Sequence, residues 1–241
     1  MASTRLAQLL ILFLLTTQVV RAQNGTKKAD PETERVMTLI SQAKKAEDEY
    51  AKSGNALDPS HPNLKFAKSL WTYRLKHPGT YATTLATAEA LRLLIRINRI
   101  SEMQEKVNTL KLSDPAWKQV LNVLLFAGVR TKDYAYVIDK AGTVADSAAD
   151  AEIKAKARYI LGDCFWRKGD TVNAKIAFQK VITDFPTTTY AEDAEGTLGE
   201  IEFLNIGQTA PLFERSTIDG SPFSLASLKG QVVVLKFWGT Y

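Results

Sequence analysis

The sequence contains few of the residues from which redox and metal sites are built. It has one cysteine, Cys164, and two histidines, His61 and His77, among 241 residues. A single thiol excludes a disulfide framework within the chain. Each histidine precedes a proline, which favours an extended or turn segment and not a shared helix face. We therefore expect no metal and no cofactor, and we expect both histidines to lie in solvated loops.

The surroundings of Cys164 indicate a buried, unreactive thiol. This residue lies on an apolar stripe at helical spacing, and two aromatic residues, Phe165 and Trp166, follow it directly. A redox-active cysteine needs a low pKa, exposure and a partner group. None of these is visible in the sequence, so we expect Cys164 to serve in packing.

Dense positive charge is also missing. The net charge is +5, and the basic residues gather no further than pairs such as Lys27-Lys28 and Lys44-Lys45. Domains that bind nucleic acid carry a more concentrated basic patch. We therefore expect no nucleic-acid partner, and we interpret the mild positive charge as an aid to solubility.

Residues 1–22 have the pattern of a secretory signal. Arg5 precedes an apolar segment, Leu6 to Leu15, that is too short to span a bilayer comfortably. Val20-Arg21-Ala22 is typical of a signal-peptidase site, so we expect cleavage after Ala22, and an uncleaved anchor is the alternative. The mature protein is then expected to be periplasmic or extracellular, without a stable membrane anchor, and to begin with a flexible lead at 23–33.

The region 34–205 is predicted to be helical almost throughout. Apolar residues recur at helical spacing, beginning with Val36, Leu39 and Ile40, and charged residues fill the positions between them. Turn residues such as His77-Pro78-Gly79 separate one helical segment from the next. We expect antiparallel helical hairpins, closed at the end of the stack by a helix from Ala191 to Phe203.

One segment, 155–188, resembles a tetratricopeptide repeat. The residues that match the family pattern are Leu161, Gly162, Phe165, Ala174, Phe178 and Pro186. Small residues at 162 and 174 allow two helices to cross closely, while the two phenylalanines fill the space between them. A more degenerate repeat precedes it, with Gly128 at the equivalent glycine position and Thr131 where an aromatic residue is expected.

The pattern changes near Asn205 from helical to β-like. Asp219-Gly220 lies between two short β-like segments and predicts a hairpin turn. Leu225 to Gly230 follows as a turn or a single helical turn. The apolar run Val232 to Trp238 is then typical of a strand buried on both faces of a sheet.

This order of segments resembles the opening of thioredoxin-like redoxin domains. The families concerned are the thiol-disulfide oxidoreductases of the TlpA and ResA kind and the peroxiredoxins. The matching residues are Gly207, Ala210-Pro211, Phe213, Asp219-Gly220, Phe223-Ser224-Leu225, Leu228-Lys229-Gly230 and Phe237-Trp238. The resemblance implies that 206–241 is a partial thioredoxin-like domain, ending with its first central strand. The expected fold class is therefore mainly α, followed by this incomplete α/β domain.

The resemblance also implies where the chemistry belongs. In the oxidoreductase branch the strand ends in a motif followed at once by the first cysteine of Cys-x-x-Cys. The residues expected to flank the active site are Phe237, Trp238, Gly239, Thr240 and Tyr241. No catalytic residue is expected within the chain itself, because the nucleophile would follow Tyr241. Glu214 is a conceivable proton-transfer partner, although a solvated position in the hairpin is the simpler interpretation.

We therefore expect an N-terminal fragment of an exported thiol-disulfide oxidoreductase that acts in redox homeostasis. Its helical domain would mediate interaction with a partner protein, or with a protein disulfide substrate. Two alternatives remain open: a peroxide-reducing redoxin, and a non-enzymatic periplasmic scaffold of helical repeats.

Overall fold

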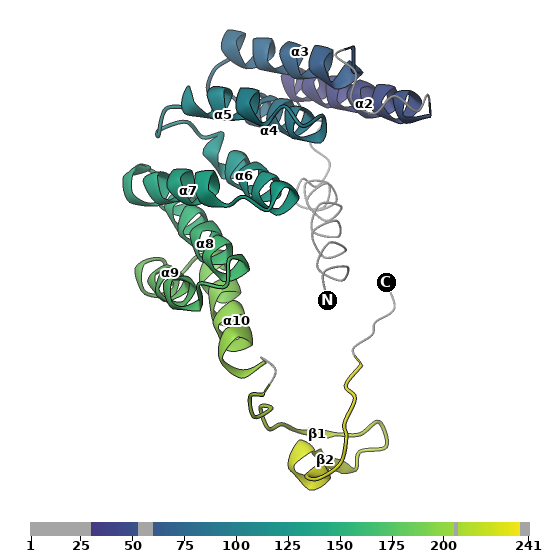
Figure 1. Ribbon diagram of the computed structural model, residues 1–241, viewed down its shortest axis with the longest axis vertical. Coiled ribbons are helices and arrows are strands. Elements are labelled where there is room, and N and C mark those ends of the chain that lie inside the picture. The colour runs from purple at the N-terminus through teal and green to yellow at the C-terminus, as the bar shows by residue number, and fades with distance from the viewer. Residues whose placement is uncertain (1–29, 53–59, 205–206, 237–241) are drawn as a thin grey trace. The chain divides into compact units, whose positions relative to one another are not determined.

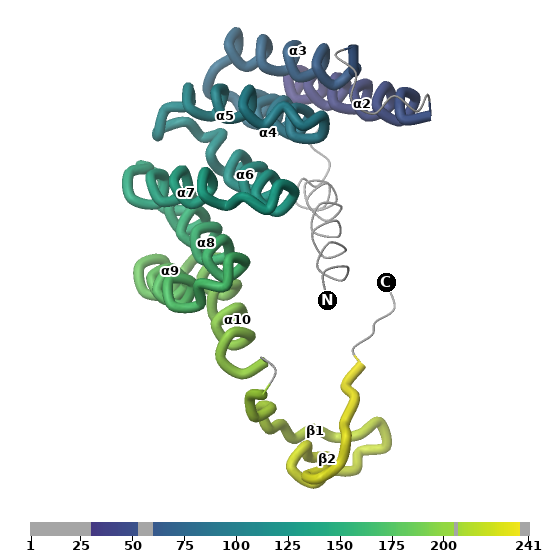
Figure 2. The backbone as a smooth tube through the Cα atoms, in the orientation of Figure 1, coloured from purple at the N-terminus to yellow at the C-terminus, as the bar shows by residue number. Residues whose placement is uncertain are grey.

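The computed structural model describes residues 30–52, 60–204 and 207–236. Within these ranges the chain is mainly helical and carries one small antiparallel sheet, as Figures 1 and 2 show. The expected signal at 1–22 and the first part of the lead lie outside the described residues. The helices are α2 (Pro31–Ala51), α3 (Pro62–Lys76), α4 (Tyr81–Arg96), α5 (Ile100–Asn108), α6 (Trp117–Thr131), α7 (Ala135–Ser147), α8 (Ala151–Arg167), α9 (Thr171–Asp184) and α10 (Thr189–Phe203).

The prediction that the chain is mainly helical is confirmed, but its first boundary is wrong. Helix α2 begins at Pro31, so the last residues of the expected flexible lead are helical. Asp30 caps this helix by accepting a hydrogen bond from the backbone N–H of Thr33 at 3.0 Å. Proline at the first helical position loses no hydrogen bond there, which makes Asp30-Pro31 a favourable helix start.

The chain divides into two compact units, Met1–Val123 and Leu124–Tyr241. In the first unit, α4 packs against α2, α3 and α5 and supplies most of the core. Four of its large apolar side chains have no exposed surface; these are Leu91, Leu93, Leu94 and Ile95. A helix with so wide an apolar face is stable only when neighbours cover it on several sides.

In the second unit, each helix packs on the one before it, from α7 to α10. A core cluster joins α9 to α10; its buried members are Ala174, Phe178, Val181, Ala194 and Ile201. The expected closing helix is thus present as α10. Its buried residues, Ala191, Ala194 and Ile201, lie on one stripe of the helix.

Helices α8 and α9 cross closely at Gly162. A Cβ atom at this position would lie 2.8 Å from the ring of Phe178, and Phe178 itself has no exposed surface. Gly128 of α6 is equally tight, because a Cβ there would lie 2.9 Å from the ring of Tyr134. The predicted packing of Gly162 against Phe178 is confirmed, while the assignment to tetratricopeptide repeats stays a prediction.

The hairpin predicted at Asp219-Gly220 is confirmed. Strands β1 (Glu214–Ser216) and β2 (Pro222–Ser224) pair antiparallel, and Gly220 occupies the turn at a φ of 84°. A positive φ of this size is readily adopted by glycine. The short 3₁₀ helix η1 (Leu225–Leu228) then follows, where a turn or single helical turn was expected.

The prediction of a buried strand after η1 is wrong for the residues described. Residues 231–236 form no strand, and Val232 and Val234 are 97% and 86% exposed. A strand requires neighbours for its backbone groups and cover for its faces. Within the described residues the only sheet is β1–β2, and it does not pair with this segment.

A glycine-to-alanine pair tests the close crossing of α8 and α9. Gly162→Ala is expected to lower the free energy of unfolding by about 1 kcal/mol, because crowding of roughly 1–3 kcal/mol exceeds the gain in helix propensity. Gly142→Ala in α7 meets nothing within 4 Å and should instead stabilise by about 1 kcal/mol. Urea denaturation followed by circular dichroism measures both, and equal stabilisation by the two variants would contradict the packing.

Candidate functional site

The hairpin carries most of the described residues that resemble a redoxin domain. Its two aromatic residues, Phe213 and Phe223, face each other with ring centroids 5.9 Å apart, and the backbone N–H of Leu225 donates to Phe213 O at 3.1 Å. These contacts fix η1 against the end of the hairpin. The local order of hairpin and one-turn helix is thus held by its own side chains and backbone.

The turn of the hairpin is also closed by local hydrogen bonds. Thr217 N–H donates to Ser221 O at 2.8 Å, and Gly220 N–H donates to Thr217 O at 2.9 Å. The Thr217 hydroxyl donates to the Asp219 carboxylate, which holds the pKa of Asp219 below its usual range. Asp219 therefore serves the turn as an ionised acceptor.

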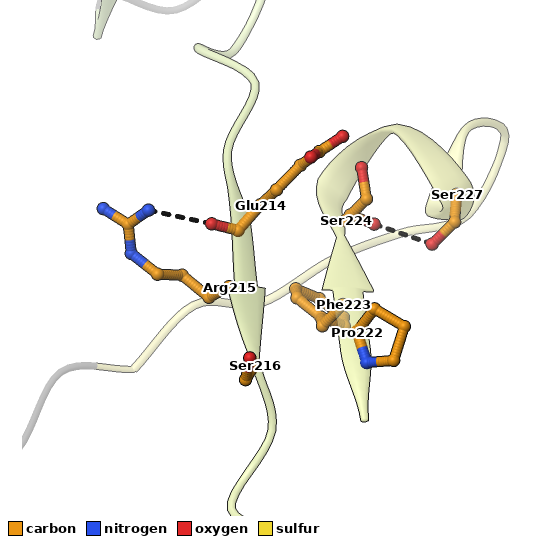
Figure 3. Close-up of a pocket in the computed structure, with 7 residues that line it drawn as sticks. All are labelled: Glu214, Arg215, Ser216, Pro222, Phe223, Ser224 and Ser227. Atoms are coloured by element: carbon orange, nitrogen blue, oxygen red, sulfur yellow. Dashed lines mark hydrogen bonds between the residues drawn. The ribbon is translucent and has the colours of Figure 1, made fainter. Parts of the chain in front are cut away.

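A shallow hollow of about 470 Å³ lies over the two strands, as Figure 3 shows. Its lining residues are Glu214, Arg215, Ser216, Pro222, Phe223, Ser224 and Ser227. Arg215 donates to the backbone oxygen of Glu214 at 2.8 Å, and Ser227 donates to Ser224 O at 2.6 Å. Glu214 is exposed, which agrees with the simpler interpretation of this residue as solvated. The polar groups serve the hairpin itself and do not converge on a common point.

The residues expected to flank the active site belong to the last five positions of the sequence. Phe237, Trp238, Gly239, Thr240 and Tyr241 all lie outside the described residues. The segment leading to them is exposed, with Val233 and Leu235 at 37% and 51%. The described residues therefore include the hairpin and the first part of the apolar run, up to residue 236.

Cys164 is buried, as predicted. It has no exposed surface in α8, and burial raises the pKa of its thiol to about 12, with Asp163 adding to the shift and Arg167 opposing it. Asp163 accepts a hydrogen bond from Arg167 at 2.8 Å. A thiol that stays protonated at neutral pH is a poor nucleophile.

The histidines lie at helix ends, but the expectation that both are solvated is wrong. His61 is 7% exposed, because its ring packs at 4.5 Å from Tyr50 and its Nδ1 accepts the Asn63 N–H at 3.1 Å. His77 is half-buried and stacks on Tyr73 at 4.4 Å. Both rings therefore contribute to packing at the ends of α3. The described ranges contain no group of three or more His, Cys, Asp or Glu side chains placed to hold a metal.

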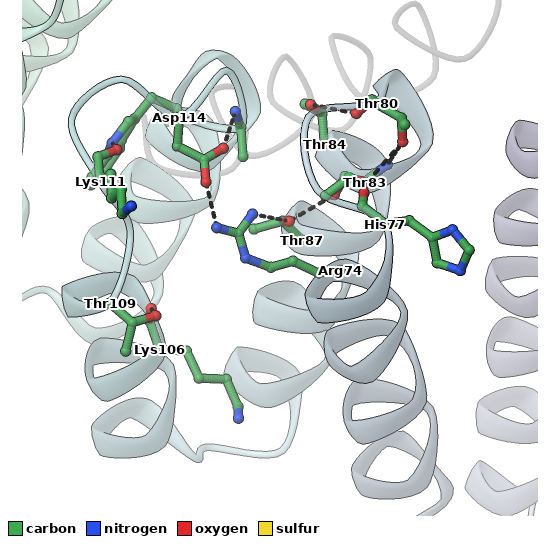
Figure 4. A network of polar contacts seen from close by, with 12 residues as sticks. Arg74, His77, Thr80, Thr83, Thr84, Thr87, Lys106, Thr109, Lys111 and Asp114 are labelled. Carbon is green, nitrogen blue, oxygen red and sulfur yellow. Dashed lines mark hydrogen bonds and ion pairs between the residues drawn. The ribbon is translucent and has the colours of Figure 1, made fainter.

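A polar network in the first unit joins α3, α4 and the connection from α5 to α6, and Figure 4 shows it. The Arg74 guanidinium donates to Thr87 Oγ1 at 3.0 Å and pairs with the carboxylate of Asp114. Asp114 in turn accepts the backbone N–H of Ala116 at 2.8 Å. Arg74 and Asp114 are only 13% and 17% exposed, so this ion pair is largely shielded from water.

The sequence interpretation missed this network, although one signal for it was visible. Threonines at 80, 83, 84 and 87 recur at helical spacing and therefore share one face of α4. The Thr87 hydroxyl donates to Thr83 O at 2.7 Å, and Thr80 caps the helix by accepting from Thr83 N–H at 3.1 Å. Each of these polar groups has a partner within the protein, so the network holds α3, α4 and the connection from α5 to α6 together.

A tyrosine-lined surface joins α8 and α10. The rings of Tyr159 and Tyr190 lie 6.2 Å apart, and the ammonium of Lys156 lies 5.9 Å from the Tyr190 centroid. Burial raises the pKa of Tyr190 to about 12. Both rings also pack against the core cluster that joins α9 to α10, so each tyrosine is only partly open at the surface.

The Arg74 ion pair is expected to stabilise the first unit. Arg74→Met should lower the free energy of unfolding by about 3 kcal/mol, because it leaves the Asp114 carboxylate shielded and unpaired. Arg99→Met is the control, since Arg99 pairs with Glu102 at 3.0 Å but is 52% exposed, and it should cost about 0.5 kcal/mol. Urea denaturation measures both variants, and similar losses would contradict the assigned role of Arg74.

Cys164 is expected to resist thiol reagents in the folded protein. Its buried, protonated thiol should react with a disulfide reagent at pH 8 far more slowly than a free thiol does, and at the ordinary rate once urea unfolds the chain. Absorbance of the released thiolate follows the reaction. Rapid stoichiometric labelling of the folded protein would contradict the burial of Cys164.

The described residues thus form a hairpin, a shielded ion-pair network and a tyrosine-lined surface. The thiol of Cys164 is buried. None of the helices in 30–52 or 60–204 is long and apolar enough to cross a membrane. Comparisons of the chain with family models, with curated proteins and with solved structures find no match.

Proposed function

We propose that the chain is the N-terminal part of an exported, thioredoxin-like thiol-disulfide oxidoreductase. The observation that supports this most is the order of β1, the Gly220 turn, β2 and η1, followed by an apolar run. The same order, with matching residues, opens the redoxin domains that the sequence resembles.

The proposed reaction is thiol-disulfide exchange. A cysteine directly after Tyr241 would lie at the N-terminus of a helix, where the helix dipole lowers its pKa. Its thiolate attacks one sulfur of a substrate disulfide and displaces the other sulfur as a thiolate. A second cysteine then attacks the mixed disulfide, which releases the reduced substrate and leaves a disulfide in the enzyme. Cys164, buried and protonated, takes no part.

The helical region is proposed to bind a protein partner or a protein disulfide substrate. The tyrosine-lined surface on α8 and α10 supports this role, because Tyr159 and Tyr190 are half-buried and close together. A helical domain attached to a redox domain would hold a substrate near the reactive cysteine. Such tethering raises the effective concentration of the substrate disulfide at the active site.

A helical scaffold without redox chemistry is the second candidate. The observation that favours it is the state of Cys164, which is the single thiol in the chain and is buried with a pKa of about 12. In that case the hairpin would serve only as a structural appendage to the helices.

The native product, isolated from its source, tests the proposal. The expected results are a mature N-terminus at Gln23, a rapidly reacting thiol pair in addition to Cys164, and reduction of insulin disulfides in the presence of dithiothreitol. Peroxide consumption without insulin reduction would replace the proposal with a peroxide-reducing redoxin. A product whose only thiol is Cys164 would overturn both redox functions and support the scaffold.

A further inference from the structure

The first turn of α2 and the C-terminal end of α3 meet at three side chains. The Tyr73 hydroxyl donates to the Glu32 carboxylate, and Nδ1 of His77 lies 3.5 Å from the same carboxylate. The rings of Tyr73 and His77 stack, with centroids 4.4 Å apart and an angle of 15° between their planes. Glu32 therefore lies between a hydroxyl that already donates to it and an imidazole that becomes positively charged when it binds a second proton.

Tyr73 remains a hydrogen-bond donor at every physiological pH. The residue is 5% exposed, and burial together with the hydrogen bond to Glu32 raises the pKa of Tyr73 to about 12. A glutamate ordinarily keeps its charge down to about pH 5, whereas histidine is the side chain that changes charge between about pH 5 and 8. Any change of this contact between pH 5 and 8 therefore depends on His77.

Three features of its surroundings favour a positive charge on His77. The carboxylate of Glu32 is an ion-pair partner. His77 is also the C-cap residue of α3, where the negative end of the helix dipole attracts a cation. Its ring lies over the ring of Tyr73, and the face of an aromatic ring attracts positive charge.

Other groups near the contact were weighed against these features. Thr83 of α4 donates its hydroxyl to the backbone oxygen of His77 and carries no charge. Figure 4 shows the His77 ring directed away from Arg74, which pairs with Asp114. Among the described residues, Glu32 is the charged side chain that pairs with His77. The other charged residues that α2 and α3 bring to this region are Asp30, Arg35 and Lys76.

We propose that Glu32, Tyr73 and His77 form a pH-sensitive clasp that binds α2 to α3 more tightly in acid. Protonation of His77 adds an ion pair with Glu32 to the hydrogen bond that Tyr73 provides at every pH. The folded chain then holds this proton more tightly than the unfolded chain does, so the added stability is present in acid and is lost as the pH rises. The clasp does not depend on the proposed redox function.

The expected size of the effect is modest. The side chains of His77 and Glu32 are 34% and 42% exposed, so water screens part of their attraction. The clasp therefore adjusts how firmly α2 is held and does not unfold the chain at neutral pH.

A double-mutant cycle at two pH values tests this proposal. His77→Phe keeps a ring to stack on Tyr73 but binds no proton, and Glu32→Gln keeps an acceptor for the Tyr73 hydroxyl but carries no charge. Urea denaturation of the full chain, followed by circular dichroism, measures the coupling between the two changes. We expect a coupling of about three- to fivefold in the unfolding equilibrium constant at pH 5.5, and none at pH 8.0.

Lys45 and Glu49, 3.9 Å apart on α2, provide a matched control pair. Lysine and glutamate ordinarily keep their charges between pH 5.5 and 8.0, so the coupling of Lys45→Gln with Glu49→Gln should be the same at both values. Equal coupling of His77 and Glu32 at the two pH values would overturn the proposal, because it would not depend on a proton. So would the absence of coupling at pH 5.5.

Discussion

Phe178 has no exposed surface, and its ring reaches that position because Gly162 carries no side chain. The packing of the second unit depends on this crossing. It sets the distance between α8 and α9. Phe178 also belongs to the buried cluster that packs α9 against α10 through Ala194 and Ile201. Because protein interiors are close-packed, a displaced ring would be felt at the next helix as well.

The first unit is held by a different kind of contact. Its core is the wide apolar face of α4, but the segments around it are positioned by polar side chains, above all by Arg74. A guanidinium with several donors can satisfy a hydroxyl and a carboxylate at once, which explains how one side chain fixes three segments. The tyrosine-lined surface on α8 and α10 lies in the second unit, as does the crossing of Gly162 and Phe178. The apolar crossing and the polar network around Arg74 therefore stabilise separate parts of the chain.

Local patterns in the sequence predicted the helices and the hairpin, and contacts between distant residues account for what was missed. Helical spacing and the Asp219-Gly220 turn depend on neighbours in sequence, and both predictions were confirmed. Arg74 and Asp114 are 40 residues apart, so no local pattern indicates their pairing. The burial of His61 likewise depends on Tyr50 from the preceding helix. The segment after η1 has the composition of a strand, yet composition does not supply the neighbours that a strand requires.

The burial of Cys164 also bears on how the chain folds after the export that we propose. An unfolded chain exposes this thiol in an oxidising compartment, where it can form mixed disulfides with other proteins. Helix α8, which carries Cys164, packs against α7 and α9, its neighbours in sequence, and local contacts of this kind form quickly. If the chain is exported as we propose, the arrangement of the helices in sequence order would shorten the period during which Cys164 is exposed to oxidation.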